Sequence, residues 1–194
     1  MMAKTEEEEM RKAIKRHQLE DSLRQECLGT ISDRITRYLE LDFIKVTPNT
    51  YFASISAECM LLYRDGYFFA CIALCQAVAE AIVRLLCTKS RFKPHKVFEK
   101  NVDTLRKRKI EPDCSESLEE IWKGRDDYHH LNPKVTTERI KLQAIAKSKM
   151  IALSTVESRV FEFQVIDGAI KPRYPKYWPQ IRNGLLNVFL RFEP

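Results

Sequence analysis

The chain has 194 residues, of which 44% are hydrophobic and 31% are charged. This length and composition suggest one domain with its own core, and only five glycines argue against a loop-rich or all-β chain. The formal charge of +6 fits a polyanionic partner such as nucleic acid, although an ordinary basic surface explains it equally well.

Six cysteines occur without a Cys-x-x-Cys pair, so no zinc or redox framework is expected. Cys71 and Cys75 would share one helix face, and we interpret them as core residues because no further ligand lies at a suitable spacing. No metal or other cofactor is predicted. Free cysteines, and a first stretch of the sequence that is charged rather than apolar, lead us to expect a cytoplasmic protein.

Residues 1–48 are expected to form an N-terminal helical arm. Acidic residues precede basic residues at helical spacing over 6–28, a pattern that stabilises an isolated helix. Apolar residues then recur every three or four positions from Ile31 to Phe43, until Pro48 breaks the pattern. Such an arm either packs against a partner or frays as a terminus.

Residues 49–160 are expected to form a helical bundle. A helix over 50–64 should precede a longer helix over 67–87 that is apolar on nearly every side. We interpret the longer helix as the buried centre of the bundle rather than as a membrane span, because polar residues interrupt it. These polar residues share one helix face, either as a solvated stripe or as the polar floor of a site; they are Gln76, Glu80 and Arg84.

Three further helices complete the predicted bundle. One covers 97–109 and ends in a basic run, whose charges either oppose the helix dipole favourably or contact nucleic acid. The next covers 115–131, where Asn132-Pro133 stops it. The last covers about 136–158.

Residues 161–194 are expected to add a β-hairpin and a helix to the same domain. Apolar and polar residues alternate from Phe161 to Val165, and Asp167-Gly168 follows, which predicts two short strands around a tight turn. A last helix is predicted over 180–192. The expected fold class is therefore mainly α: an up-and-down helical bundle with a small C-terminal β-hairpin and a terminal helix.

Residues 125–130 read Arg-Asp-Asp-Tyr-His-His and gather phosphate-binding and acid–base groups at the end of a predicted helix. Arginine offers a fixed fork of donors to phosphate oxygens, and histidine serves as a general acid or base near neutral pH. His129 would stack on Arg125, whereas His130 reaches it only if the last turn loosens. These groups suffice for metal-free RNA cleavage, in which a base activates the 2′-hydroxyl.

A structural interpretation of the same residues stays open at this point. Histidines at the end of a helix can cap its last carbonyl groups. Arg125, in turn, can pair with Asp127 or with Glu80 as an ordinary ion pair. The local pattern alone therefore does not decide between catalysis and capping.

The order and spacing of these features resemble the HEPN superfamily of helical domains. In that family an apolar helix precedes a second helix that ends in an arginine, a polar residue, a few more residues and then a histidine. Here Arg125, Asp126 and His130 match this pattern, and the helix that starts after Asp65-Gly66 matches the apolar one. The resemblance covers roughly residues 50–160. It implies a bundle of four or five helices, dimerisation and, in active members, metal-independent endoribonuclease activity.

The resemblance also implies roles for single residues. Arg125 would bind the scissile phosphate, and His130 would act as the general acid or base. The remaining candidates are Asp126 at the polar position of the family pattern, His129 as a helper or substitute for His130, Glu80 as the residue that orients Arg125, and Tyr128 as a support.

The leading hypothesis from the sequence is an endoribonuclease of toxin or antiviral-defence type that cuts RNA at a site formed across a homodimer. An antitoxin or a sensor protein is a candidate regulator, and no membrane contact is expected. The alternatives are an inactive HEPN-type module for dimerisation or for nucleotide or protein binding, and a plain helical interaction protein. Basic residues expected to hold the RNA backbone without reading its bases are Lys89, Arg91, Lys93, Arg106, Lys107, Arg108 and Lys134.

Overall fold

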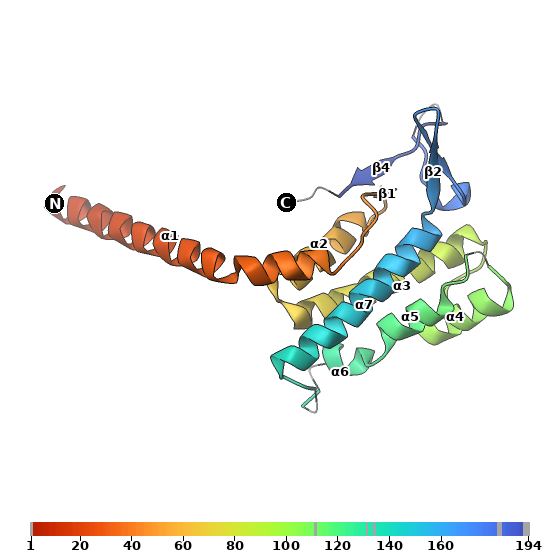
Figure 1. The fold of residues 1–194 in the computed structure, drawn as a ribbon, viewed down its shortest axis with the longest axis horizontal. Coiled ribbons are helices and arrows are strands. Elements are labelled where there is room, and N and C mark those ends of the chain that lie inside the picture. The colour runs from red at the N-terminus through yellow and green to blue at the C-terminus, as the bar shows by residue number, and fades with distance from the viewer. Residues whose placement is uncertain (1, 111, 131, 134, 182–183, 192–194) are drawn as a thin grey trace.

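The computed structural model of the protein describes residues 2–110, 112–130, 132–133, 135–181 and 184–191. This part of the chain is mainly helical with a few short antiparallel strands, which confirms the mainly α class (Figure 1). The elements in chain order are α1 (Met2–Leu39), β1 (Val46–Pro48), α2 (Ala53–Asp65), α3 (Phe68–Lys89), α4 (Phe98–Lys107), α5 (Ser115–Trp122), α6 (Arg125–His129), α7 (Arg139–Val160), β2 (Phe163–Ile166), β3 (Ala169–Pro172), η1 (Pro175–Tyr177) and β4 (Val188–Leu190).

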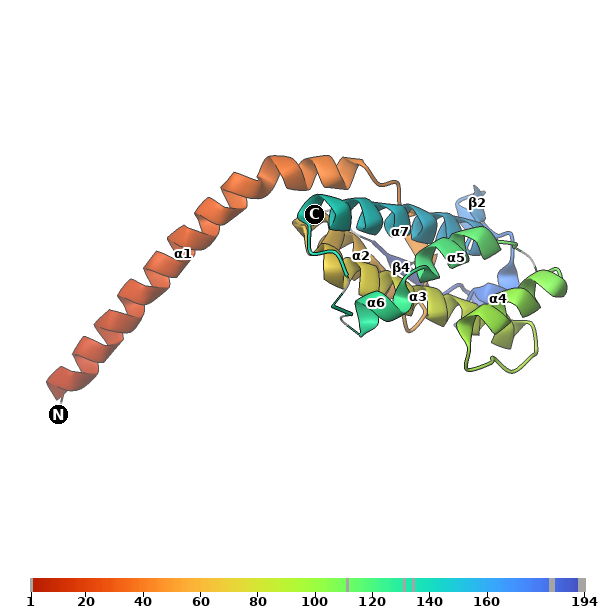
Figure 2. The ribbon, with the colours of Figure 1, turned by 90° about the horizontal axis from the view of Figure 1, so that it is seen from below.

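Helix α3 is the centre of the body, as its apolar sequence predicts. It packs against α2, α4, α5, α6 and α7 (Figure 2). Cys71, Cys75 and Ile82 on α3 are fully buried, so the two cysteines are core residues, as predicted. The helix is long and apolar enough to cross a membrane, but half of its most apolar 18-residue window is buried inside the fold.

Helix α1 is one continuous helix of 38 residues that ends at Leu39, where the sequence suggested two successive segments reaching Phe43. Its C-terminal end packs against α2, and the rest projects away from the body (Figures 1 and 2). The contact with α2 is partly polar: Arg37 Nε donates to the Arg64 carbonyl at 2.7 Å, and Arg34 pairs with Asp65 at 2.7 Å. The helical arm predicted over 1–48 is thus confirmed as a helix as far as Leu39, whereas its end is wrong, because Val46–Pro48 form strand β1.

The C-terminal segment departs from the sequence prediction in one element. The hairpin is confirmed, because β2 and β3 pair around Asp167 and Gly168, which both have the positive φ of a tight turn. The helix predicted over 180–192 is wrong: within the described residues, the segment forms β4, which pairs antiparallel with β1. Residues 182–183 and 192 of that predicted helix lie outside the described residues.

A buried ion pair explains why the C-terminal segment takes this path. Arg191, directly after β4, pairs with Glu157 on α7 at 2.7 Å, and both side chains are almost completely buried. Ser56 on α2 donates to the same carboxylate at 2.6 Å. Buried charges need such partners. The residue at the end of β4 is therefore fastened to two core helices, a long-range constraint that helical periodicity within the segment does not reveal.

Candidate functional site

The motif segment does not continue helix α5, which corrects the prediction of a single helix over 115–131. Helix α5 ends at Trp122, Lys123 has an extended backbone, and Gly124 has a φ of 70°. Glycine adopts this left-handed conformation without the steric cost that other residues meet. A new short helix, α6, then begins at Arg125. Arg125 therefore stands at the start of a helix rather than near the end of one.

Two buried polar side chains hold the end of α5 in place. The Nζ of Lys149, on α7, donates to the carbonyls of Glu120, Ile121 and Lys123 at 3.1, 2.8 and 2.7 Å. Gln76, on α3, donates to the Ile121 carbonyl at 3.2 Å. They satisfy carbonyls that a helix end leaves without partners. Burial lowers the pKa of Lys149 to about 8. The position of Arg125 thus depends on a buried lysine that the sequence did not single out.

Arg125 and His130 lie together on the surface. The Nη1 of Arg125 is 3.5 Å from the Nε2 of His130 and 3.0 Å from a carboxylate oxygen of Asp126. The guanidinium also lies over the Trp122 ring, 5.5 Å from its centroid. The structure therefore brings together the arginine and the histidine that the spacing predicted. His130 directly follows the C-terminal end of α6 and contacts Arg125 from there.

His129, the last residue of α6, is exposed as well. Burial of part of its ring lowers its pKa below the ordinary value, and the charges of Arg125 and His130 lower it further. A lowered pKa keeps an imidazole neutral at pH 7, which is the form that accepts a proton. His129 thus has the protonation state that a general base requires.

The other members of the segment have structural partners. Tyr128 is buried, and its ring packs 5.5 Å from that of Phe69, which fastens α6 to α3. The Asp127 carboxylate accepts a hydrogen bond from Asn132 at 3.0 Å. Asp127 thus stabilises the turn after α6, and the acidic partner of Arg125 is its neighbour Asp126.

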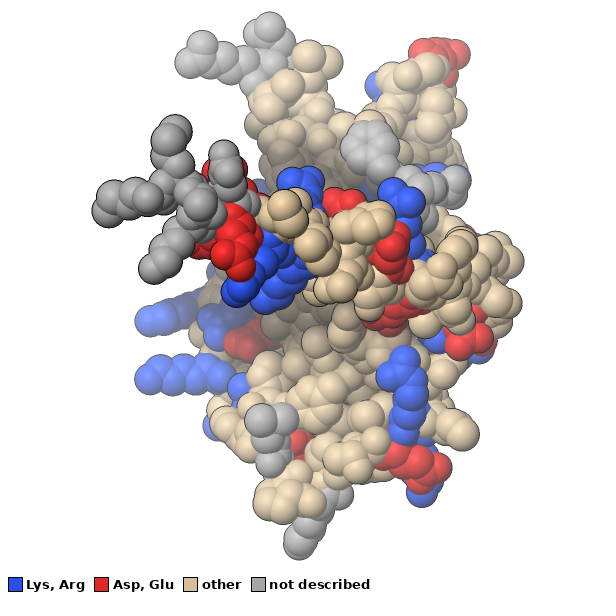
Figure 3. All heavy atoms as spheres, turned by 90° about the vertical axis from the view of Figure 1, so that its left-hand side faces the viewer, with Lys and Arg blue, Asp and Glu red and all other residues tan. Residues whose placement is uncertain are grey.

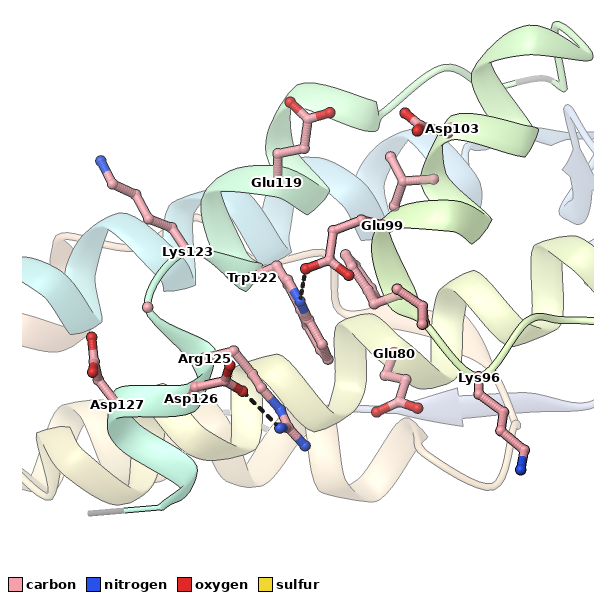
Figure 4. Close-up of a pocket in the computed structure, with 14 residues that line it drawn as sticks. Glu80, Lys96, Glu99, Asp103, Glu119, Trp122, Lys123, Arg125, Asp126 and Asp127 are labelled. Carbon is pink, nitrogen blue, oxygen red and sulfur yellow. Dashed lines mark hydrogen bonds and ion pairs between the residues drawn. The ribbon is translucent and has the colours of Figure 1, made fainter. Parts of the chain in front are cut away.

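The polar face of α3 divides into a buried and a solvated part. Gln76 is fully buried, so the interpretation of all three residues as a solvated stripe is wrong for this one. Glu80 and Arg84 form an ion pair at 2.6 Å with both side chains partly exposed, as that interpretation predicts. Glu80 lies in the same hollow as Arg125 (Figure 4), but the ion pair that it makes is with Arg84. The expected orienting role on Arg125 is therefore taken by Asp126 and by the Trp122 ring.

A hollow of about 810 Å³ opens beside Arg125, between α4, α5 and the start of α6 (Figure 4). Its wall includes Trp122, whose ring stacks on that of Phe98 with 3.9 Å between the ring centroids. The same Trp122 ring also contacts the Arg125 guanidinium. The basic residues that line it are Lys96, Lys123 and Arg125. The acidic residues that line it are Glu80, Glu99, Asp103, Glu119, Asp126 and Asp127. Negative side chains thus outnumber positive ones, so the hollow as a whole repels a polyanion.

The predicted backbone-binding residues do not gather around Arg125. Lys89, Arg91 and Lys93 are exposed, but they lie at and just after the C-terminal end of α3, whereas α6 packs near its N-terminal part (Figure 2). Arg106 pairs with Glu119 at 2.6 Å, and Arg108 lies over the Phe92 ring. Lys107 is exposed, and Lys134 lies outside the described residues. On the face drawn in Figure 3, positive and negative side chains are intermixed rather than collected in one basic patch.

Among the described residues, no group of three or more histidine, cysteine, aspartate or glutamate side chains is placed to hold a metal ion. Comparison with known proteins adds no family: no family model, curated protein or solved structure matches this chain. The functional argument therefore depends on the geometry around Arg125 alone.

Proposed function

We propose that the protein is a metal-independent endoribonuclease of toxin or antiviral-defence type, acting in the cytoplasm. The observation that carries the proposal is the distance of 3.5 Å between Arg125 and His130 on an exposed surface. A guanidinium and an imidazole in contact provide a phosphate-binding group and a proton-transfer group. The two groups are close enough to act on one sugar–phosphate linkage.

The reaction would proceed by attack of the ribose 2′-hydroxyl on the adjacent phosphorus. A neutral histidine takes the hydroxyl proton, the 2′-oxygen bonds to phosphorus, and the bond to the 5′-oxygen breaks. A protonated histidine gives its proton to that leaving oxygen, while Arg125 stabilises the charge on the phosphoryl oxygens. The products are a 2′,3′-cyclic phosphate and a 5′-hydroxyl.

Two groups with opposite protonation states are needed at once. The lowered pKa of His129 favours the base role for this residue, which leaves the acid role to His130. A second copy facing the first across a two-fold axis would supply a further pair of histidines, so that base and acid come from either copy. The composite homodimeric site is part of the proposal.

Asp126 must leave Arg125 when phosphate binds. Its side chain is 85% exposed, so it can rotate into water without disturbing the core. Ion pairs of this exposed kind are worth about 0–1 kcal/mol, which a phosphate bound by two charge-assisted hydrogen bonds exceeds. Asp126 therefore acts as a displaceable partner that keeps Arg125 extended towards the hollow.

The test is cleavage of a mixed-sequence RNA by the purified full-length chain in the presence of a metal chelator. Arg125→Ala and His130→Ala should each reduce the rate by about 100-fold or more, with an unchanged melting temperature. His17→Ala, an exposed histidine on α1 that does not line the hollow, is the matched control and should cleave like the wild type. Equal cleavage by all variants, or none by the wild type, would contradict the proposal.

A second candidate is an inactive HEPN-type module that dimerises or binds a nucleotide or protein. The excess of acidic residues in the hollow favours it, because this charge opposes a long RNA strand there. Asp126→Asn separates the two functions. In a nuclease, the freed Arg125 binds RNA more tightly and cleavage continues, whereas an inactive module shows no cleavage with either side chain.

A further inference from the structure

Helix α1 exposes large apolar side chains from Met10 to Ile35, most of them along the part that projects away from the body. Single exposed apolar residues are normal on protein surfaces, but a regular series is not. The exposed fractions are 64% for Met10, 52% for Ile14, 63% for Leu28, 47% for Ile31 and 53% for Ile35. Leu19, Leu23 and Leu39 of α1 are exposed as well but do not follow the spacing described next, so these five residues form the starting observation.

The spacing of these residues is that of a coiled coil. Ile14, Leu28 and Ile35 are separated by multiples of seven, and Met10 and Ile31 are separated by three times seven. Met10 and Ile31 lie four residues before Ile14 and Ile35, and Ile31 lies three residues after Leu28. This spacing of four and three is the alternation of the two core positions in a heptad repeat. Residues 10–38 thus carry a seam of four heptads, long enough for a stable coiled coil.

The middle of this seam is charged rather than apolar. Between Ile14 and Leu28 the core positions hold His17, Asp21 and Arg24. If two copies of α1 run antiparallel around a centre between residues 22 and 23, each Asp21 lies opposite Arg24 of the second copy. In a parallel pair Asp21 would face Asp21 and Arg24 would face Arg24, which is repulsive twice.

The same centre matches the apolar ends of the seam. Met10 then lies opposite Ile35 of the second copy, and Ile14 lies opposite Ile31. The fifth residue, Leu28, lies opposite His17. Each pair joins one core position to the other, which is the pairing required in an antiparallel coiled coil. Charge and apolar pattern therefore select the same partner, direction and register.

We propose that α1 is a self-association surface, on which α1 of a second copy docks antiparallel with its centre between residues 22 and 23. The contact goes beyond the proposed nuclease function and does not depend on it. A helix of this length spans about 57 Å at about 1.5 Å per residue, so antiparallel pairing sets the two bodies towards opposite ends. A composite Arg125/His130 site would need a separate contact, and a chain with both contacts forms an assembly larger than a dimer.

The helix is prepared for this role by its own charges. Arg11 pairs with Glu7, Lys12 with Glu8 and Arg16 with Glu20, each four residues apart. Such pairs support a helix that has no body to pack on. The charged middle of the seam weakens the pairing, but it rejects other registers and the parallel direction, as polar core residues do in coiled coils.

The test measures the mass of the full-length chain by sedimentation equilibrium. Asp21→Arg and Arg24→Asp, each alone, place like charges opposite one another and should halve the mass of the wild-type assembly. The double variant Asp21→Arg with Arg24→Asp restores opposite charges only in the antiparallel register, so the wild-type mass should return. Circular dichroism on each variant checks that α1 stays helical.

A matched pair of apolar variants tests the seam itself. Ile31→Ser removes a seam residue and should halve the mass, whereas Leu23→Ser removes a still more exposed residue outside the seam and should leave the mass unchanged. A monomeric wild type, single reversals that keep the full mass, or a helical double variant that does not recover it would each overturn the proposal. An effect of Leu23→Ser without one of Ile31→Ser would do the same.

Discussion

The body and helix α6 each contain an arginine paired with a carboxylate, but the pair in the body is buried and the pair in α6 is exposed. Arg191 is buried and bound by Glu157 and Ser56. Arg125 is partly exposed and held by an aspartate whose side chain is almost wholly in water. The first arginine cannot change partners without a large loss of stability, and the second can do so at small cost. This difference separates a structural charge from one available to a ligand.

The strongest way to break the comparison is to remove the buried carboxylate. Glu157→Ala leaves Arg191 charged and unpaired in the core, and it should lower the free energy of unfolding by about 3–5 kcal/mol. Glu8→Ala removes the exposed partner of Lys12 and should change it by less than about 0.5 kcal/mol. Chemical denaturation measures both. Similar losses for the two variants would show that burial does not distinguish these charges.

The next largest effect concerns the lysine beneath the motif. Lys149→Met keeps the length of the side chain but removes the lysine donor from the carbonyls of Glu120 and Lys123, while the Ile121 carbonyl keeps Gln76 as a donor, and it should cost about 1–3 kcal/mol. It should also reduce RNA cleavage, because the start of α6 is then less well fixed. A stable Lys149→Met variant with unaltered cleavage would show that Lys149 does not position Arg125.

The same lysine predicts a pH dependence. Its pKa is about 8 in the folded protein and near 10.5 in the unfolded chain, so the unfolded chain binds more protons between these values. The contribution of Lys149 to stability should therefore increase as the pH rises from 8 to 10.5. The difference in unfolding free energy between wild type and Lys149→Met, measured at pH 7 and pH 10, isolates this residue from the other titrating groups. A difference that shrinks would contradict the assigned direction.

A smaller effect is expected at the break between α5 and α6. Gly124→Ala forces alanine into a φ of 70° and should cost about 1 kcal/mol, although the new methyl group has room beside Tyr128. Gly29→Ala in the exposed helix α1 should instead stabilise that helix by about 0.5–1 kcal/mol. Thermal unfolding, with circular dichroism for α1, reports both. If Gly124→Ala stabilised the protein, the break between α5 and α6 would not require a glycine at this position.

The smallest effect is electrostatic. The positive charge of Arg125 helps to lower the pKa of His129, so Arg125→Ala should raise that pKa towards 6.5 without restoring it fully, because burial is the larger cause. Titration of the imidazole by nuclear magnetic resonance follows the change. Lys93→Ala, a distant charge, is the control. An unchanged pKa in Arg125→Ala would mean that the two groups do not interact in solution.

Local patterns predicted some parts of the molecule and missed others for a physical reason. The apolar series over 67–87 located the central helix, and the interval from Arg125 to His130 located two side chains that meet, since both depend on neighbours along the chain. The break at Gly124 depends on Lys149, which is distant in sequence, and the path of the C-terminal segment depends on Arg191 reaching Glu157. Such tertiary contacts override helical periodicity and leave no local signal.

The measurement closest to the central claim is the chemical identity of the RNA ends after incubation with the purified chain and a metal chelator. Mass spectrometry should find 2′,3′-cyclic phosphates and 5′-hydroxyls with the wild type, and no new ends with the double variant of Arg125→Ala and His130→Ala. Intact RNA in both samples, or the same ends in both, would contradict a catalytic role for this pair.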